Sequence, residues 1–538
     1  MLFHSHFVPS QRRGWRIIRV LVCLVLLLQG LLPLAAVARE PVEALPTRPT
    51  QPVTQPASAE LLQPAAINAP QAVGIVATKR DAFATDADSD GLGDANDVVR
   101  YTIVITNTGS TDATGVAFDD PLDDDSALVA GSVRVSPLAR PDAFNAVGNT
   151  QLLVGISQPP NVPALAVAGN LFNNDSEFLG DTFTLQSFTP TSTNGGTVVV
   201  NANGTFSYLP PTGFTGSDTF SYTIADGGGL TSVATVTITV ANRVWYVNNA
   251  VANGDGRSTT PFNTLAAAQT ASAVNDVIFV HTGAGNYGGI TLKNGQQLIG
   301  RGVALIVGGN TLLAAGTVPT LSAAGTLVTL AQNNTIQGLN INSQSSGMGI
   351  SGTNFGTATI NTVALNGGPA LNLTTGTLNG NFSTLSSSGG ASGVALTTVS
   401  GSLTATAGTM SGISGTDFLI SGGTIAVTYP GSITNTAGRS IQIESHATGA
   451  ISFSGAINDT GMGMLIQNNT SGRISFTNAS KSYSTGANSA ITMITNTGAT
   501  VEFTNGGLAI TTSSGTGMNI TGGGILRVTG TGLSLIHI

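Results

Sequence analysis

A run of aspartates between residues 86 and 97 has the spacing of a loop that binds a hard cation. A cation such as calcium takes about six to eight oxygen ligands, and carboxylates at alternate loop positions can converge on one centre. Gly91 permits the sharp turn of such a loop, Leu92 offers its carbonyl, and Asp97 replaces the longer glutamate that usually closes it. The alternative is a solvated acidic linker. We predict calcium as the cofactor, bound by Asp86, Asp88, Asp90, Leu92, Asp94 and Asp97.

Residues that could act on a substrate are scarce in the C-terminal half of the chain. Residues 302–416 contain no Asp, Glu, Lys, Arg or His. Asp417 and Glu444 are expected about 13 Å apart along a strand, farther than the carboxylate pair of a glycosidase. Asp459 and Glu502 occupy different positions in the repeat described below, so we expect these four acids not to cluster. We therefore predict no catalytic residue and no enzymatic activity.

Arg473, Glu502 and Arg527 do fall at similar positions of that repeat. Glu502 lies between two apolar residues that face inward, so its side chain is expected to point outward. The three side chains then form a surface ion ladder, which contributes little to stability.

The composition limits the partners of the protein. Without the four arginines of residues 1–38, 15 basic residues remain against 27 acidic ones, a net charge of −12. This charge argues against nucleic acid as a partner. Hydrophobic residues make up 41% of the chain and charged residues 9%, the reverse of a disordered chain. The abundance of Gly, Thr, Ser and Asn favours short strands and turns over helices.

The first 38 residues have the features of a secretory signal peptide. A group of arginines precedes the apolar run Val20–Leu34, and Ala36-Val37-Ala38 has the small-x-small pattern of a cleavage site. An uncleaved membrane anchor is the alternative, but the apolar run is short, and no later stretch could span a bilayer. The lone cysteine would leave with the signal. Residues 39–71 contain seven prolines, which predict an extended linker.

An apolar-x-apolar pattern recurs through residues 242–532. The first members of successive pairs lie 23 to 27 residues apart. A period of this size indicates stacked coils, and alternation within each coil indicates strands. Many of these pairs are followed by a second apolar pair and then by a third apolar position. We therefore predict a parallel β-helix with three short strands in each coil. The pairs are Met348/Ile350, Leu371/Leu373, Val394/Leu396, Phe418/Ile420, Ile441/Ile443, Met464/Ile466, Ile491/Met493 and Met518/Ile520.

Three segments resemble known families. The stretch Tyr101–Gly109, with Ala113–Asp119 after it, resembles the bacterial conserved-repeat domain of unknown function (DUF-eleven), an Ig-like sandwich of surface proteins. Gly204–Gly216, followed by Ser217–Gly227, resembles the bacterial cadherin-like repeat, whose acidic calcium loop is thin here. The segments that open the repeat region, such as Val244–Val247, Pro261–Ala268 and Asn334–Ile341, resemble the entry coils of pectin-lyase-like right-handed β-helices, which implies a capping helix near Thr264–Ala273.

The predicted fold is all-β, with two Ig-like β-sandwich domains at 72–136 and 140–241 followed by a right-handed parallel β-helix at 242–532. Residues 533–538 depart from the repeat and resemble a translated sequencing adapter, so we expect a truncated β-helix. The predicted function is that of an exported structural or adhesin-like protein, extracellular or in the bacterial cell envelope, with surface glycans or proteins as partners. The alternative is a secreted polysaccharide-active enzyme or a carbohydrate-binding β-helix.

Overall fold

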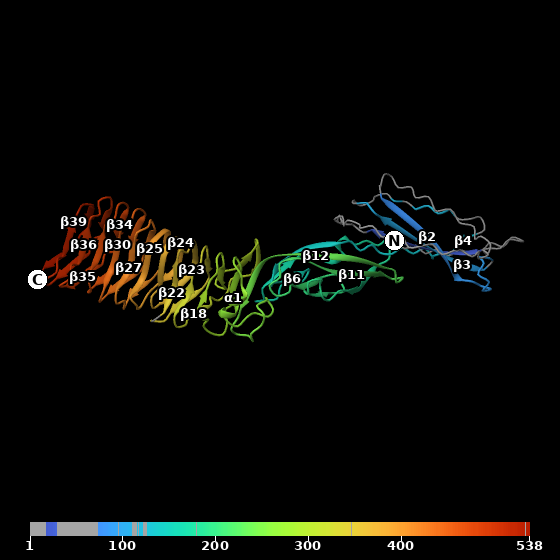
Figure 1. Ribbon diagram of the computed structural model, residues 1–538, viewed down its shortest axis with the longest axis horizontal. Helices are drawn as coiled ribbons and strands as arrows, with labels where there is room; N and C mark the ends of the chain where they lie inside the picture. The colour runs from blue at the N-terminus through green and yellow to red at the C-terminus, as the bar shows by residue number, and fades with distance from the viewer. Residues whose placement is uncertain are drawn as a thin grey trace, which may run out of the picture.

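The structure is a computed structural model that describes residues 18–28, 74–94, 96–109, 116, 118–121, 126–178, 180–345, 347–532 and 534–537. It is an elongated molecule, with a small sheet at one end, a second β unit in the middle and a long stack of coils at the other end (Figure 1). The predicted all-β class and the parallel β-helix are confirmed. The predicted linker 39–71 and most of the predicted signal peptide lie outside the described residues.

The N-terminal unit contains a four-stranded sheet in the order β2-β3-β1-β4. The alternation predicted around Tyr101 is present, since Val99, Ile103 and Ile105 of β3 are buried. The backbone of β1 lies parallel to β3 and falls within the predicted signal peptide, whose cleavage stays a prediction. The strands are β1 (Ile18–Leu28), β2 (Ile75–Thr85), β3 (Asp97–Asn107) and β4 (Ala127–Leu128).

The middle unit is a sandwich of two sheets. One sheet has the order β8-β11-β12-β5 and the other β7-β6-β10-β9. Tyr208, Phe206 and Tyr222 are fully buried in the core of this unit. The elements are β5 (Asp142–Gly148), β6 (Gln151–Val154), β7 (Ala164–Val167), the 3-10 helix η1 (Leu171–Asn174), β8 (Phe183–Phe188), β9 (Thr197–Val200), β10 (Phe206–Leu209), β11 (Gly216–Asp226) and β12 (Thr231–Val247).

Strand β12 belongs to both the sandwich and the β-helix. Its first part pairs with β11 and β5, and its last four residues pair in parallel with β13. It therefore crosses the predicted domain boundary at residues 241 and 242 without a break. Helix α1 (Leu265–Ala271) follows as the predicted capping helix, and the Thr264 side chain caps it by accepting a hydrogen bond from the Ala267 amide.

The first coils are less regular than the later ones and include an antiparallel hairpin, β16–β17, which the sequence pattern did not predict. Leu312 of this hairpin is buried in the same apolar cluster as the sandwich core. The strands are β13 (Val277–Val280), β14 (Ile290–Thr291), β15 (Gln297–Gly300), β16 (Leu305–Val307), β17 (Asn310–Leu313), β18 (Thr320–Leu321), β19 (Thr326–Thr329), β20 (Thr335–Gln337) and β21 (Asn340–Ser343).

The later coils stack three columns of parallel strands. One column runs through β27, β30, β33, β36 and β39, a second through β28, β31, β34, β37 and β40, and a third through β26, β29, β32, β35, β38 and β41. The strands are β22 (Met348–Thr353), β23 (Thr357–Gly367), β24 (Leu371–Leu385), β25 (Ser392–Ala405), β26 (Thr409–Ser411), β27 (Thr416–Ser421), β28 (Ala426–Tyr429), β29 (Ser432–Asn435), β30 (Arg439–Glu444), β31 (Ala450–Phe453), β32 (Ile457–Asp459), β33 (Met464–Gln467), β34 (Arg473–Phe476), β35 (Lys481–Gly486), β36 (Ile491–Ile494), β37 (Thr500–Phe503), β38 (Leu508–Thr512), β39 (Met518–Thr521), β40 (Ile525–Val528) and β41 (Ser534–His537).

From Leu371 onward the register of the first column follows the predicted repeat. Leu371 pairs with Val394, and the first residue of each later apolar pair is in register with the first residue of the next pair. The first step was predicted wrongly, because Leu371 pairs with Ile350 and not with Met348. A shift of two residues keeps side chains on the same face, so the spacing alone could not reveal it. Strand β41 continues the third column by pairing with β38, although residues 533–538 were expected to depart from the repeat.

Candidate functional site

The predicted cation loop connects β2 to β3. Ligand oxygens of Asp86, Asp88 and Asp90 lie within 4.8 Å of one another. Backbone amides hold these carboxylates in place: Asp86 accepts hydrogen bonds from Ser89 at 2.8 Å and Gly91 at 3.1 Å, and Asp90 accepts one from Leu92 at 2.7 Å. Gly91 has φ of 75°, a left-handed conformation that suits glycine. The alternate spacing therefore does bring three carboxylates together.

The structure places Asp97 differently from the other three aspartates. Asp97 is fully buried, and its two oxygens accept hydrogen bonds from the amides of Ala87 and Asp94, both at 2.8 Å. Asp97 thus fastens the two ends of the loop together. Whether Asp94 and the Leu92 carbonyl also bind a cation stays a prediction.

The donors in this loop fit a hard divalent cation. They are carboxylate oxygens without nitrogen or sulfur among them, and this is the set that calcium prefers over transition metals. Asp88 and Asp90 are exposed, so an ion could reach them from solvent. Water would complete the coordination that three carboxylates leave open.

The acids of the β-helix do not all stay apart as predicted. Asp417 at the start of β27 and Asp459 at the end of β32 are both fully buried at one interior corner of the coils. Asn435 joins them, because it donates to Asp417 at 3.2 Å and pairs with Asp459 in the next coil. The expectation that these acids do not cluster was wrong for this pair. The expectation assumed that separation along a strand keeps two residues apart. A coil turns at its corner, so residues on different strands of the coil can meet there.

Glu444 and Glu502 are both held by neighbouring side chains. Glu444 accepts hydrogen bonds from Ser421, Gln442 and Gln467, which outweigh its partial burial and lower its pKa. Glu502 forms the predicted ion ladder. Its side chain is only 6% exposed, while those of Arg473 and Arg527 are 62% and 61% exposed.

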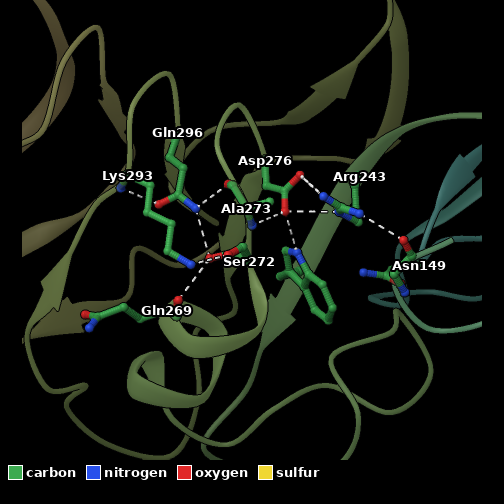
Figure 2. A network of polar contacts seen from close by, with 10 residues as sticks. Asn149, Arg243, Gln269, Ser272, Ala273, Asp276, Lys293 and Gln296 are labelled. Carbon is green, nitrogen blue, oxygen red and sulfur yellow. Dashed lines mark hydrogen bonds and ion pairs between the residues drawn. The ribbon is translucent and has the colours of Figure 1, made fainter. Parts of the chain in front are cut away.

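Asp276 is the centre of a polar network at the start of the β-helix (Figure 2). It accepts hydrogen bonds from the Trp245 indole at 2.8 Å, from the Arg243 guanidinium at 3.0 Å and from the Ala273 amide at 2.7 Å. Arg243 also donates to the Gly213 carbonyl of the sandwich. The network therefore ties α1 and β13 to the sandwich, which makes Asp276 a structural residue.

A second buried acidic group lies in the sandwich, and sequence analysis did not predict it. The Tyr222 hydroxyl lies within 3.2 Å of carboxylate oxygens of Asp142 and Asp175 and of the carbonyls of Arg140 and Leu171. Burial raises the pKa of Asp142 to about 7 and that of Asp175 to about 6. These residues are 47 to 82 positions from Tyr222 in the chain, so local spacing could not have found the group.

Comparisons with known proteins give one family match, in the sandwich. Residues 135–242 match the family described as bacterial cadherin-like domain. A search of curated proteins found no match. Among solved structures, the chain is similar to a family 28 exopolygalacturonase from Yersinia enterocolitica, with 11% identity, a TM-score of 0.19, and coverage of 62% of this chain and 86% of that chain. This similarity is too low to bear on activity.

The sandwich therefore coincides with the segment that matches the bacterial cadherin-like family, and it is joined to a β-helix in a modular chain. This combination is compatible with an extracellular or envelope protein. The helices in the described part of the chain are all too short to cross a membrane.

Proposed function

We propose that this protein is an exported, non-catalytic surface protein whose β-helix presents a long uncharged face to glycans or proteins. The observation that carries the proposal is how the carboxylates of the β-helix are buried or paired. Asp417 and Asp459 are enclosed within the coils, Asp276 is held at the junction, and Glu502 lies beneath two arginines. A catalytic acid or base must contact the scissile bond, and enclosed carboxylates do not meet that requirement. Glu444 and Asp255 are more exposed, but neighbouring side chains hold both of them.

The outer face of the neutral stretch supports a binding role. Asn361, Asn381 and Thr404 lie in register on β23, β24 and β25, and all three are exposed. The Asn381 side chain donates to Asn361 at 3.1 Å. Adjacent strands place such groups about 4.8 Å apart, which gives a regular row of hydrogen-bonding groups. Repeated weak contacts along such a row favour avidity over turnover.

We further propose that the loop of Asp86, Asp88 and Asp90 binds calcium and orders the N-terminal unit. The convergent carboxylates support this role.

The experiment is a comparison of cleavage and binding with the full chain. Pectins, alginates and neutral glycans are incubated with the protein, with and without calcium, and new chain ends are measured. We expect no cleavage, and binding to neutral glycans on an array. Glu444 is partly exposed, whereas Asp417, Asp459 and Glu502 are buried. Cleavage that is lost in Glu444→Gln would establish the enzymatic alternative.

A further inference from the structure

The corner occupied by Asp417 lies inside the stack of coils. Asp417 is opposite Ser440 of the next coil, between the register pairs Thr416/Arg439 and Phe418/Ile441. The side chains of Asp417 and Asn435 are at most 1% exposed. Water therefore does not reach this carboxyl group from outside.

The two aspartates at this corner have different hydrogen-bond partners. Asp459 accepts hydrogen bonds from the backbone amides of Ser440 at 3.3 Å, Gly461 at 2.8 Å and Gly463 at 3.4 Å. Burial raises the pKa of Asp459, and these three donors oppose that shift by stabilising the carboxylate. Among the described residues, Asp417 has a single donor, the Asn435 amide group, on its Oδ2 atom. Asp417 is thus the poorer site for a negative charge.

Two oxygens of this pair have no partner among the described residues. They are Oδ1 of Asp417 and Oδ1 of Asn435, and both are buried. If Asp417 is ionised, both atoms are acceptors, and a buried acceptor without a donor is costly. A carboxylic acid and an amide can instead exchange two hydrogen bonds, one from the amide N–H and one from the acid O–H. The first of these bonds is present, and a proton on Asp417 would supply the second.

We propose that Asp417 binds a proton in the folded protein and forms a reciprocal acid–amide pair with Asn435, which makes this corner a proton-binding site inside the β-helix. The proton removes an uncompensated buried charge and satisfies both remaining oxygens. It also avoids two negative charges at one corner when Asp459 is ionised.

The groups around Asp417 are consistent with this arrangement. The titratable groups that interact with this corner are Asp459 of β32, Tyr429 of β28 and Tyr483 of β35, and none of them supplies a positive charge. Burial raises the pKa of Asp417 to about 7, the Asn435 hydrogen bond lowers it in part, and the Asp459 charge raises it further. Both tyrosines are buried, which raises their pKa and keeps them neutral.

The sign of the pH effect follows from this shift. The folded state binds the Asp417 proton more tightly than the unfolded state, whose carboxyl pKa is about 3.9. The stabilisation is therefore complete below about pH 4 and is lost as the pH rises through about 7. Asp142 and Asp175 of the sandwich titrate in a similar range, so a variant at residue 417 is needed to isolate this corner.

The test compares the full-length wild type with Asp417→Asn at constant calcium. An asparagine can exchange two hydrogen bonds with Asn435 without a proton. We expect the melting temperature of Asp417→Asn to fall less than that of the wild type between about pH 5 and pH 9. Near neutral pH, the difference between the infrared spectra of the wild type and the variant should contain a protonated carboxyl band, because Asp142 and Asp175 contribute to both spectra and cancel.

Asp459→Asn is the matched control, because an amide cannot accept all three backbone hydrogen bonds on oxygen. We expect it to be destabilised at both pH values. The proposal is overturned if Asp417→Asn melts below the wild type at the higher pH, or if the difference spectrum contains no protonated carboxyl band. Stabilisation of the wild type but not Asp417→Asn by added sodium or calcium at high pH would assign the site to a metal ion instead.

Discussion

Apolar residues alternate along the strands of both the N-terminal unit and the β-helix, but the two regions bury these side chains to very different extents. Among the described side chains of the N-terminal unit, the cluster has three buried residues, Val99, Ile103 and Ile105, with a few partly buried neighbours. In the β-helix one apolar cluster continues from Trp245 at the entry to Ile510 near the end of the described chain. The difference arises because each coil covers the apolar row of the coil before it, whereas most of β2 remains exposed.

This comparison shows which region depends on polar contacts. The N-terminal unit has a Lys79–Asp120 ion pair at 2.7 Å, with the Lys79 ammonium 4.1 Å from the centre of the Tyr101 ring. It also has the acidic loop, whose carboxylates repel one another without a cation. We therefore expect the N-terminal unit to respond to calcium, and the β-helix to respond to changes in packing.

The largest expected effect is a loss of packing in the β-helix. Phe476 is fully buried and stacks between Phe453 and Phe503, at centroid distances of 5.7 and 4.9 Å. Phe476→Ala should cost about 3–5 kcal/mol, measured by urea denaturation. Hydrogen exchange should locate the loss in the adjacent coils, because coils interact chiefly with their neighbours. Phe178→Ala, at an exposed position, is the control and should change stability by less than about 0.5 kcal/mol. Equal losses in both variants would contradict the packing argument.

The next effect concerns the junction between the sandwich and the β-helix. Asp276→Ala removes the acceptor for the buried Trp245 indole and should cost about 1–3 kcal/mol. We expect the sandwich and the β-helix of the wild type to unfold in one transition, because they share an apolar cluster. Calorimetry of the variant should show two. Asp255→Ala is the matched control, because Asp255 also binds an arginine but is more exposed. A single unaltered transition in Asp276→Ala would show that the apolar core alone joins the units.

The calcium effect should be confined to the N-terminal unit. With a Kd of about 10⁻⁴–10⁻³ M, about 10 mM calcium should stabilise this unit by about 1.4–2.7 kcal/mol. The double variant Asp86→Ala, Asp90→Ala should lose this gain, whereas Asp81→Ala, which lies outside the loop, should keep it. Thermal melts in calcium and in chelator provide the measurement. Identical wild-type melts in both would remove calcium from the proposed function.

The smallest effect is expected at the ion ladder of the β-helix. Arg527→Gln should cost less than about 1 kcal/mol, because the arginine is mostly exposed and salt screens the pair. Denaturation at low and high salt measures the contribution of this ion pair to the free energy of unfolding. A larger loss that disappears in high salt would mean that charge, and not packing alone, holds the last coils together.

The repeat and the cation loop could be predicted because both depend on short-range spacing. Ile441 and Met464 face each other as the 23-residue period requires, and Asp86, Asp88 and Asp90 converge as alternate loop positions should. Contacts across corners could not be predicted in this way. Asp417 meets Asn435 eighteen residues later because the coil turns between them, and no periodicity within one strand encodes that turn.

Lys481 is a second residue whose position the apolar pattern could not predict. It occupies the apolar third column between Ile457 and Leu508 and is buried there. Its ammonium donates to the carbonyls of Thr504 and Gly506, at 2.9 and 2.7 Å. A lysine breaks an apolar pattern in sequence, but its long stem packs like an aliphatic side chain while the head finds acceptors.

The continuity of β12 has a mechanical consequence. A pulling force on the sandwich and the β-helix would act along this strand, because it is bonded to β11 and β5 at one end and to β13 at the other. Ladder hydrogen bonds lie across the strand direction, so tension along β12 loads many of them together in shear. The sandwich would therefore transmit tension to the β-helix through a continuous strand, without a flexible hinge that could extend first.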